Sequence, residues 1–139
     1  MSNTETLDLD KIKNTLRKLF EKDDNVEFAY VFGSVIKGKT HPLSDIDVAV
    51  YLKDDSIRKV VELNAKIVDA LGDNVDFVVL NKAPYSLRYI IISEGVLIFS
   101  RNENLRIDFE SKAMLLGIDE KEALDAIERE LIKRFLNDN

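Results

Sequence analysis

The apolar residues of the chain recur in two spacings, and each spacing predicts a different kind of element. Apolar positions three and four residues apart, as at Leu9, Ile12 and Leu16, predict helices, and short apolar runs bounded by turn-forming residues predict strands. We therefore expect helices at 9–21, 54–71, 85–93 and from 102 to the end, and strands at 26–32, 45–52, 75–80 and 96–99. This order predicts a single α/β (α+β) domain over residues 1–139.

The C-terminal helical pattern predicts a break near Gly117. Asp119, followed three residues later by Glu122, resembles a capping box, so we expect the helix to restart there. The mixed acidic and basic residues over 120–134 predict a solvated helix face with pairs four residues apart.

Composition narrows the chemistry that the chain can support. There is no cysteine, which excludes disulfides and thiolate metal sites, and the single histidine, His41, cannot form a multi-histidine site. Any metal must then be held by oxygen, which favours Mg²⁺, Mn²⁺ or Ca²⁺. The net charge of −6 weighs against direct nucleic-acid binding. No apolar run has signal-peptide or membrane-spanning character, so we expect a cytoplasmic protein without a membrane segment.

Candidate chemistry gathers between Tyr30 and Leu52. The pair Gly33-Ser34 directly follows a predicted strand, where it can offer backbone N–H groups and a hydroxyl to a phosphate. Asp45 and Asp47 are separated by a single residue at the start of the next strand and therefore point to the same face. Each feature alone is weak, because a Gly-Ser pair is most often a plain turn and two such acids are most often solvated.

Asp76 lies within an apolar run and strengthens the pattern. A buried unpaired polar group costs on the order of 2–7 kcal/mol, so we expect this carboxylate to have a partner. If its strand neighbours that of Asp45 and Asp47, three carboxylates converge, and divalent cations would relieve their repulsion.

Metal beside a phosphate-binding turn indicates phosphoryl or nucleotidyl transfer by two metal ions. In that scheme Asp45 and Asp47 bridge the ions. Asp76 binds the catalytic ion and helps to take the proton from the acceptor hydroxyl.

The pattern G-S-x10-D-x-D with a third aspartate resembles the signature of the DNA polymerase β-like nucleotidyltransferase superfamily, and the run GSVIKGKTHPLSDIDVAVYL is similar to its minimal (MNT) branch. The resemblance covers residues 26–80. It implies the polymerase β-like fold, a small mixed sheet flanked by helices with a helical C-terminus. It also implies a nucleotide site that includes Gly33, Ser34, Lys37 and Ser44.

Residues 88–114 also resemble the antitoxin members of HEPN/MNT toxin–antitoxin modules. That resemblance implies ATP as substrate, two Mg²⁺ ions, and a hetero-oligomer with a HEPN-family ribonuclease toxin. The toxin would be neutralised by transfer of AMP to one of its tyrosine hydroxyls. Two alternatives stay open: an antitoxin that acts by occluding the toxin, and a nucleotidyltransferase that acts on RNA or on a small hydroxylated molecule. The acidic charge balance weighs against RNA.

Overall fold

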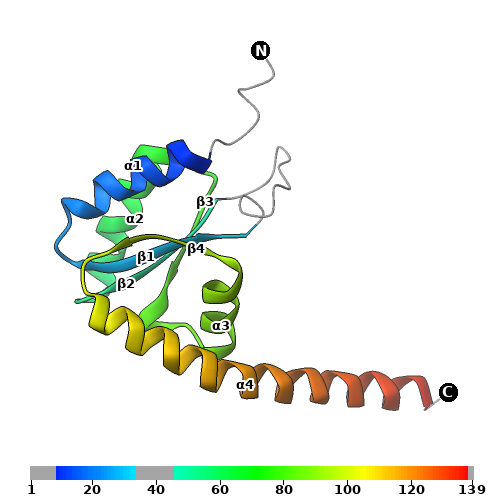
Figure 1. Cartoon of the computed structure of the whole chain (residues 1–139). Coiled ribbons are helices and arrows are strands. Elements are labelled where there is room, and N and C mark those ends of the chain that lie inside the picture. The colour runs from blue at the N-terminus through cyan, green and yellow to red at the C-terminus, as the bar shows by residue number, and fades with distance from the viewer. Residues whose placement is uncertain (1–8, 34–45, 138–139) are drawn as a thin grey trace.

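A computed structural model describes residues 9–33 and 46–137 (Figure 1). Its elements in chain order are α1 (Leu9–Glu21), β1 (Val26–Phe32), β2 (Ile46–Leu52), α2 (Ile57–Leu71), β3 (Val75–Val79), the short 3-10 helix η2 (Leu80–Lys82), α3 (Tyr85–Glu94), β4 (Val96–Ser100) and α4 (Glu103–Asn137). The predicted α/β (α+β) class is confirmed, and most element ends lie within about three residues of the predicted ones. None of the described helices is long and apolar enough to cross a membrane.

The described strands form one four-stranded sheet in the order β3–β2–β1–β4. β1 pairs antiparallel with both β2 and β4, whereas β2 and β3 are parallel and are joined through α2. The predicted mixed sheet is therefore confirmed. Residues 34–45, which connect the antiparallel neighbours β1 and β2, lie outside the described part of the chain.

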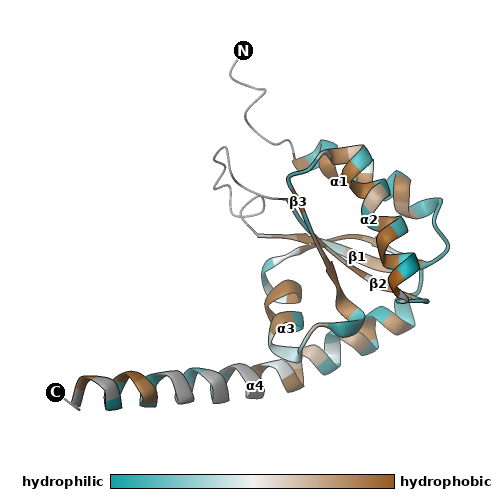
Figure 2. Ribbon diagram, turned by 180° about the vertical axis from the view of Figure 1, so that it is seen from behind, coloured by the Kyte–Doolittle hydropathy of each residue, from teal (hydrophilic) through white to brown (hydrophobic). Residues whose placement is uncertain are grey.

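Helices cover both faces of the sheet, with α1 and α2 on one side and α3 and α4 on the other (Figure 1). Successive residues of the central strand β2 point alternately to the two faces of the sheet. Val48 and Val50 pack toward α1 and α2, and Ala49 and Tyr51 pack toward α3 and α4. Because β1 and β2 are buried on both faces, their sequences are almost continuously apolar, as the hydropathy colours of Figure 2 show.

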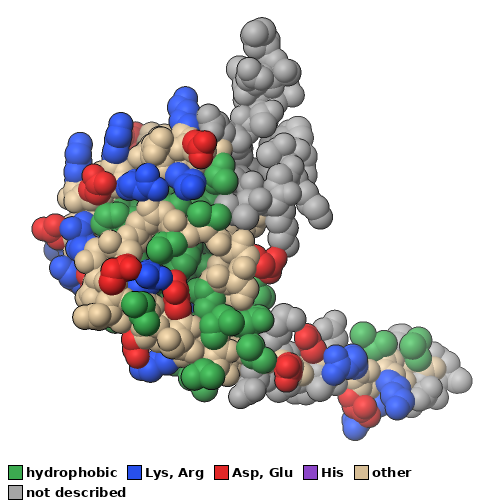
Figure 3. Space-filling view, in the orientation of Figure 1, with side chains coloured by type: hydrophobic (Ala, Val, Ile, Leu, Met, Phe, Trp, Pro, Cys, Tyr) green, Lys and Arg blue, Asp and Glu red, His purple; other side chains and the backbone are tan. Residues whose placement is uncertain are grey.

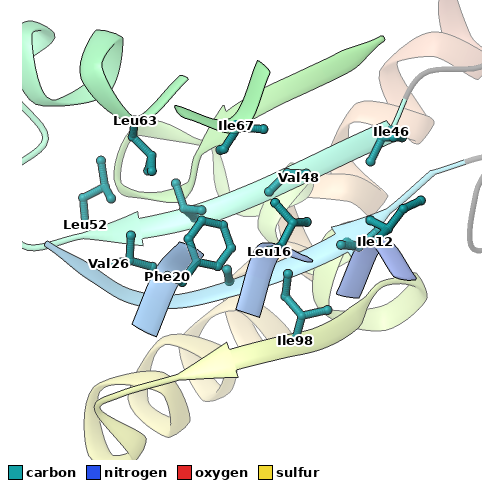
Figure 4. Packing of buried hydrophobic residues seen from close by; sticks show 13 residues of the cluster. Ile12, Leu16, Phe20, Val26, Ile46, Val48, Leu52, Leu63, Ile67 and Ile98 are labelled. Carbon is teal, nitrogen blue, oxygen red and sulfur yellow. The ribbon is translucent and has the colours of Figure 1, made fainter. Parts of the chain in front are cut away.

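The fully buried side chains under α1 and α2 are aliphatic, apart from the ring of Phe20. Figure 4 shows these side chains pointing toward one another from α1 (Ile12, Leu16, Phe20), α2 (Leu63, Ile67), β2 (Ile46, Val48, Leu52) and β4 (Ile98). Burial of one such side chain stabilises the fold by about 1.5–3 kcal/mol. This cluster fixes the sheet on which the candidate site is built.

The predicted helix break near Gly117 is wrong, and so is the predicted restart at Asp119, because α4 is continuous from Glu103 to Asn137. A Cβ atom on Gly117 would lie 2.5 Å from the carbonyl oxygen of Tyr85 and 2.5 Å from the Cβ of Tyr89. Glycine at this position lets α3 and α4 approach closely, so it serves packing and does not end the helix. Beyond Gly117, α4 continues away from the body of the protein (Figure 1).

Candidate active site

Two of the predicted carboxylates lie side by side at one end of the sheet. Asp47 of β2 is paired in register with Asp76 of β3, and on its other side with Phe32 of β1. Paired residues place their side chains on the same face, and neighbouring strands lie about 4.8 Å apart. Phe32, Asp47 and Asp76 therefore form a row across three strands on the face covered by α3 and α4.

Gly33 lies against the first of these carboxylates. Its φ angle is 91°, a left-handed conformation that favours glycine. A Cβ atom at this position would lie 1.7 Å from Oδ2 of Asp47, so any larger residue would displace the carboxylate. The glycine that the sequence assigns to phosphate binding is thus in contact with a predicted metal ligand.

Asp76 differs from the expectation of a buried carboxylate, because its side chain is exposed. It is the second residue of β3, which is an edge strand. Val75, Phe77 and Val79 take the face packed on α1 and α2, and Asp76 points to the other face. The carboxylate therefore needs no buried partner, and a ligand can reach it directly.

Helix α3 ends beside this row. A Cβ atom on Gly95, the residue that follows α3, would lie 2.5 Å from the carbonyl oxygen of Ile91 and 3.2 Å from the Cβ of Phe32. The end of α3 is therefore packed directly onto the strand that leads to Gly33. The sequence pattern did not identify Phe32 as a neighbour of the site. Its place beside Asp47 follows from the register between β1 and β2, which the pattern of apolar residues does not reveal.

Aromatic rings support the strands behind the row. Phe28 stacks on Tyr51 with ring centroids 5.0 Å apart, and Phe109 of α4 lies 5.2 Å from Phe28. The Arg88 guanidinium lies over the Phe109 ring at 5.1 Å and donates hydrogen bonds to the carbonyl oxygens of Ala83 and Asn81. Arg88 thus fastens α3 to α4 and to the chain before it.

An ionic network attaches α4 to β1. Arg106 pairs with Glu103 at 2.7 Å and with Glu110 at 3.0 Å, and the Tyr30 hydroxyl donates a hydrogen bond to Glu110. The Arg106 guanidinium holds the pKa of Glu103 at about 2. Burial, together with the hydrogen bond to Glu110, raises the pKa of Tyr30 well above its usual value near 10, so the hydroxyl keeps its proton into alkaline solution. The network fixes the direction in which α4 leaves the sheet.

Four predicted site residues, Ser34, Lys37, Ser44 and Asp45, lie outside the described residues. Within 9–33 and 46–137 there is no group of three acidic, histidine or cysteine side chains that could hold a metal ion. Asp47 and Asp76 supply the oxygen ligands that suit Mg²⁺, which proteins commonly bind through one or two carboxylates together with substrate phosphates. The described donors fit such an ion.

Comparisons with known proteins agree with this geometry. Residues 14–104 match the protein family described as "Polymerase beta, Nucleotidyltransferase". Protein adenylyltransferase MntA of Shewanella oneidensis is 36% identical over 88 residues, which span 60% of this chain and 61% of that protein, less than two thirds of its length.

Two solved structures have the same fold. A chain of a toxin–antitoxin crystal structure with AMP-PNP is 26% identical, with a TM-score of 0.71 over 86% of this chain and 98% of that one. A chain in the structure of the tri-AMPylated Shewanella oneidensis HEPN toxin in complex with MNT antitoxin is 23% identical. Its TM-score is 0.68 over 88% of this chain and 98% of that one, and at this identity the match supports only a shared fold. The predicted resemblance to MntA-type antitoxins is confirmed. The chain belongs to the polymerase β nucleotidyltransferase family.

Proposed function

We propose that this chain is an antitoxin that transfers AMP from ATP to a tyrosine hydroxyl of a HEPN-family toxin and thereby neutralises it. The single observation that carries the proposal is the pairing of Asp47 with Asp76 at an open end of the sheet, with Gly33 against Asp47. The naming of the related MntA as a protein adenylyltransferase supports the class of reaction. AMP-PNP in a toxin–antitoxin structure of similar fold supports ATP as the nucleotide.

The proposed reaction exchanges one bond to the α-phosphorus of ATP. The tyrosine oxygen of the acceptor attacks this phosphorus, the bond to the β-phosphate oxygen breaks, and pyrophosphate leaves. The hydroxyl proton passes to the carboxylate of Asp76, whose exposed position lets an acceptor approach. The products are an AMP–tyrosine phosphodiester and pyrophosphate.

Several residues would hold the nucleotide and its metal ions. Asp45, Asp47 and Asp76 would bind two Mg²⁺ ions, which when bound lower the pKa of the acceptor hydroxyl and balance the charge of the leaving pyrophosphate. Backbone N–H groups beginning at Gly33, with Ser34, Lys37 and Ser44, would bind the phosphates.

The test is transfer of label from α-labelled ATP to a HEPN toxin from the same genome. The variant Asp47→Asn keeps the size of the side chain and removes its charge, so we expect transfer to be lost while the fold is kept. Asp24→Asn is the control, because Asp24 is 95% exposed and precedes β1 at the opposite end of the sheet. Normal transfer by Asp47→Asn would contradict the proposal.

Exposed apolar side chains on α4 favour a second candidate, an antitoxin that neutralises by binding alone. Under that alternative the Asp47→Asn chain, expressed at the same level as the wild type, still protects cells from the toxin. Under the proposed enzyme it does not.

A further inference from the structure

The far half of α4, which is the part beyond Gly117, carries apolar side chains that no described residue covers. Leu131, Ile132 and Leu136 have 59%, 52% and 65% of their surface exposed. Nearer the body, Met114, Leu115 and Leu116 are also exposed. Figure 3 shows hydrophobic side chains where α4 passes the body and again on its far half, and Figure 2 shows the same hydrophobic turns from behind.

These side chains occupy more than one side of the helix. Ile132 and Leu136 are four residues apart and share a side, whereas Leu131 precedes Ile132 by one residue and lies about 100° around the helix from it. A group of large exposed apolar side chains is typical of a surface that binds another protein. The part of α4 beyond Gly117 spans about 20 residues and about 30 Å, roughly the diameter of a small domain.

The far half of α4 also has a definite place relative to the candidate active site. In Figure 1 and in the opposite view of Figure 2, it projects from the side of the body at which β1 ends and β2 begins. That is the end of the sheet where Asp47 and Asp76 lie. A protein bound along the helix would therefore stand beside the two carboxylates.

We propose that the exposed apolar side chains on the far half of α4 form the docking surface for the acceptor protein, a helical toxin, and hold it beside Asp47 and Asp76. This inference rests on the proposed function, which requires a protein acceptor. A protein acceptor has to be held near the two carboxylates, and the far half of α4 offers exposed apolar side chains that could hold it.

The side chains of this surface on α4 indicate which class of partner it binds. Apolar residues four apart on a helix pack best between the ridges of other helices, as in a helical bundle. The charged residues among them, Arg129, Glu130, Lys133 and Arg134, are of both signs, and nucleic acid would require a stronger positive excess. A folded helical protein can cover several sides of α4 at once.

The experiment compares two pairs of exposed apolar residues with the same helical spacing. The test variant is Ile132→Glu with Leu136→Glu on α4, and the control is Ile57→Glu with Val61→Glu on α2, whose side chains are 76% and 60% exposed. All four positions are solvent-exposed, so both variants should fold, which circular dichroism checks. Binding to the purified HEPN toxin is measured by calorimetry in the Asp47→Asn background, so that catalysis does not affect the affinity.

The α4 pair should raise the dissociation constant at least about tenfold, and the α2 pair should change it less than about twofold. In the active enzyme, the α4 pair should raise KM for the toxin and leave kcat unchanged. Equal effects of the two pairs, or no effect of the α4 pair, would overturn the docking surface even if AMP transfer is normal. If the wild type transfers no AMP but only the α4 pair loses binding, the proposed reaction fails and the docking surface stands.

A second copy of this chain is the other occupant that the experiment separates. Sedimentation of the chain without toxin reports its self-association. A wild-type dimer that the α4 pair converts to a monomer, with toxin affinity unchanged, would assign the surface to self-association and overturn the proposal. A monomer in both cases, with toxin affinity lost, supports it.

Discussion

Replacement of Gly33 by alanine tests whether this glycine holds Asp47 in its working position. The added Cβ would lie 1.7 Å from Oδ2 of Asp47, whereas real Cβ atoms essentially never come within 3.0 Å of such an atom. The carboxylate oxygen therefore has to move by more than about 1 Å. Because Asp47 is proposed to bind the metal ions, we expect this displacement to reach the chemistry.

The expected magnitudes separate activity from stability. A misplacement of about 1 Å near reacting atoms can cost about 100-fold in rate, which is about 2.7 kcal/mol in activation free energy. Alanine at a φ of 91° costs about 1–3 kcal/mol in the free energy of unfolding, whatever its neighbours. We thus expect Gly33→Ala to lose AMP transfer at least about 100-fold while it remains folded.

Gly72→Ala is the matched control. Gly72 has a φ of 94°, but a Cβ there would meet nothing within 4 Å. This variant should lose similar stability in urea unfolding and keep its rate of AMP transfer, measured in single turnovers with α-labelled ATP. A Gly33→Ala enzyme that transfers at the wild-type rate would refute the reasoning, because Asp47 would then function without the space that Gly33 leaves.

Further predictions concern the site, the sheet and the pH dependence of stability. Asp76→Asn should keep binding of ATP with Mg²⁺, measured by calorimetry, and lose transfer, since it removes the acceptor of the proton; surviving transfer would contradict its role. Phe109→Ala should lower the urea-unfolding free energy by about 3–5 kcal/mol, because this ring is 5% exposed and packs on Phe28; a loss below about 1 kcal/mol would contradict that packing. Because the pKa of Tyr30 is raised in the folded state, its contribution is complete below its usual pKa near 10 and is lost as the pH rises further. Tyr30→Phe should therefore lose less stability above about pH 10 than the wild type, and an identical loss would refute this assignment.

The local pattern predicts the elements well because each element is apolar in its own period. Gly72 ends α2 as expected, and Tyr85 begins α3 as expected. Gly117 shows where the local pattern fails, since the same residue type can end a helix or allow two helices to touch. Only the contact with Tyr85 and Tyr89, residues about 30 positions earlier, decides between these roles.

The candidate site was predictable in part. The position of Asp47 at the start of a predicted strand, and that of Asp76 within an apolar run, predict two carboxylates for the site. The register of β2 and β3 places them together. Exposure of Asp76 was not predictable, because the sequence does not say that β3 is an edge strand. The surface of α4 was not predicted either. Its charges suggest a solvated face, but Leu131, Ile132 and Leu136 lie between them.

The most direct test of the central claim is the intact mass of the HEPN toxin after expression together with this chain. We predict that toxin expressed with the wild type gains the mass of one or more AMP groups on tyrosine. Toxin expressed with Asp47→Asn should keep its unmodified mass, although the two proteins still purify together. Unmodified toxin in both samples, or AMP groups in both, would contradict the assignment of Asp47 and Asp76 as the centre of nucleotidyl transfer.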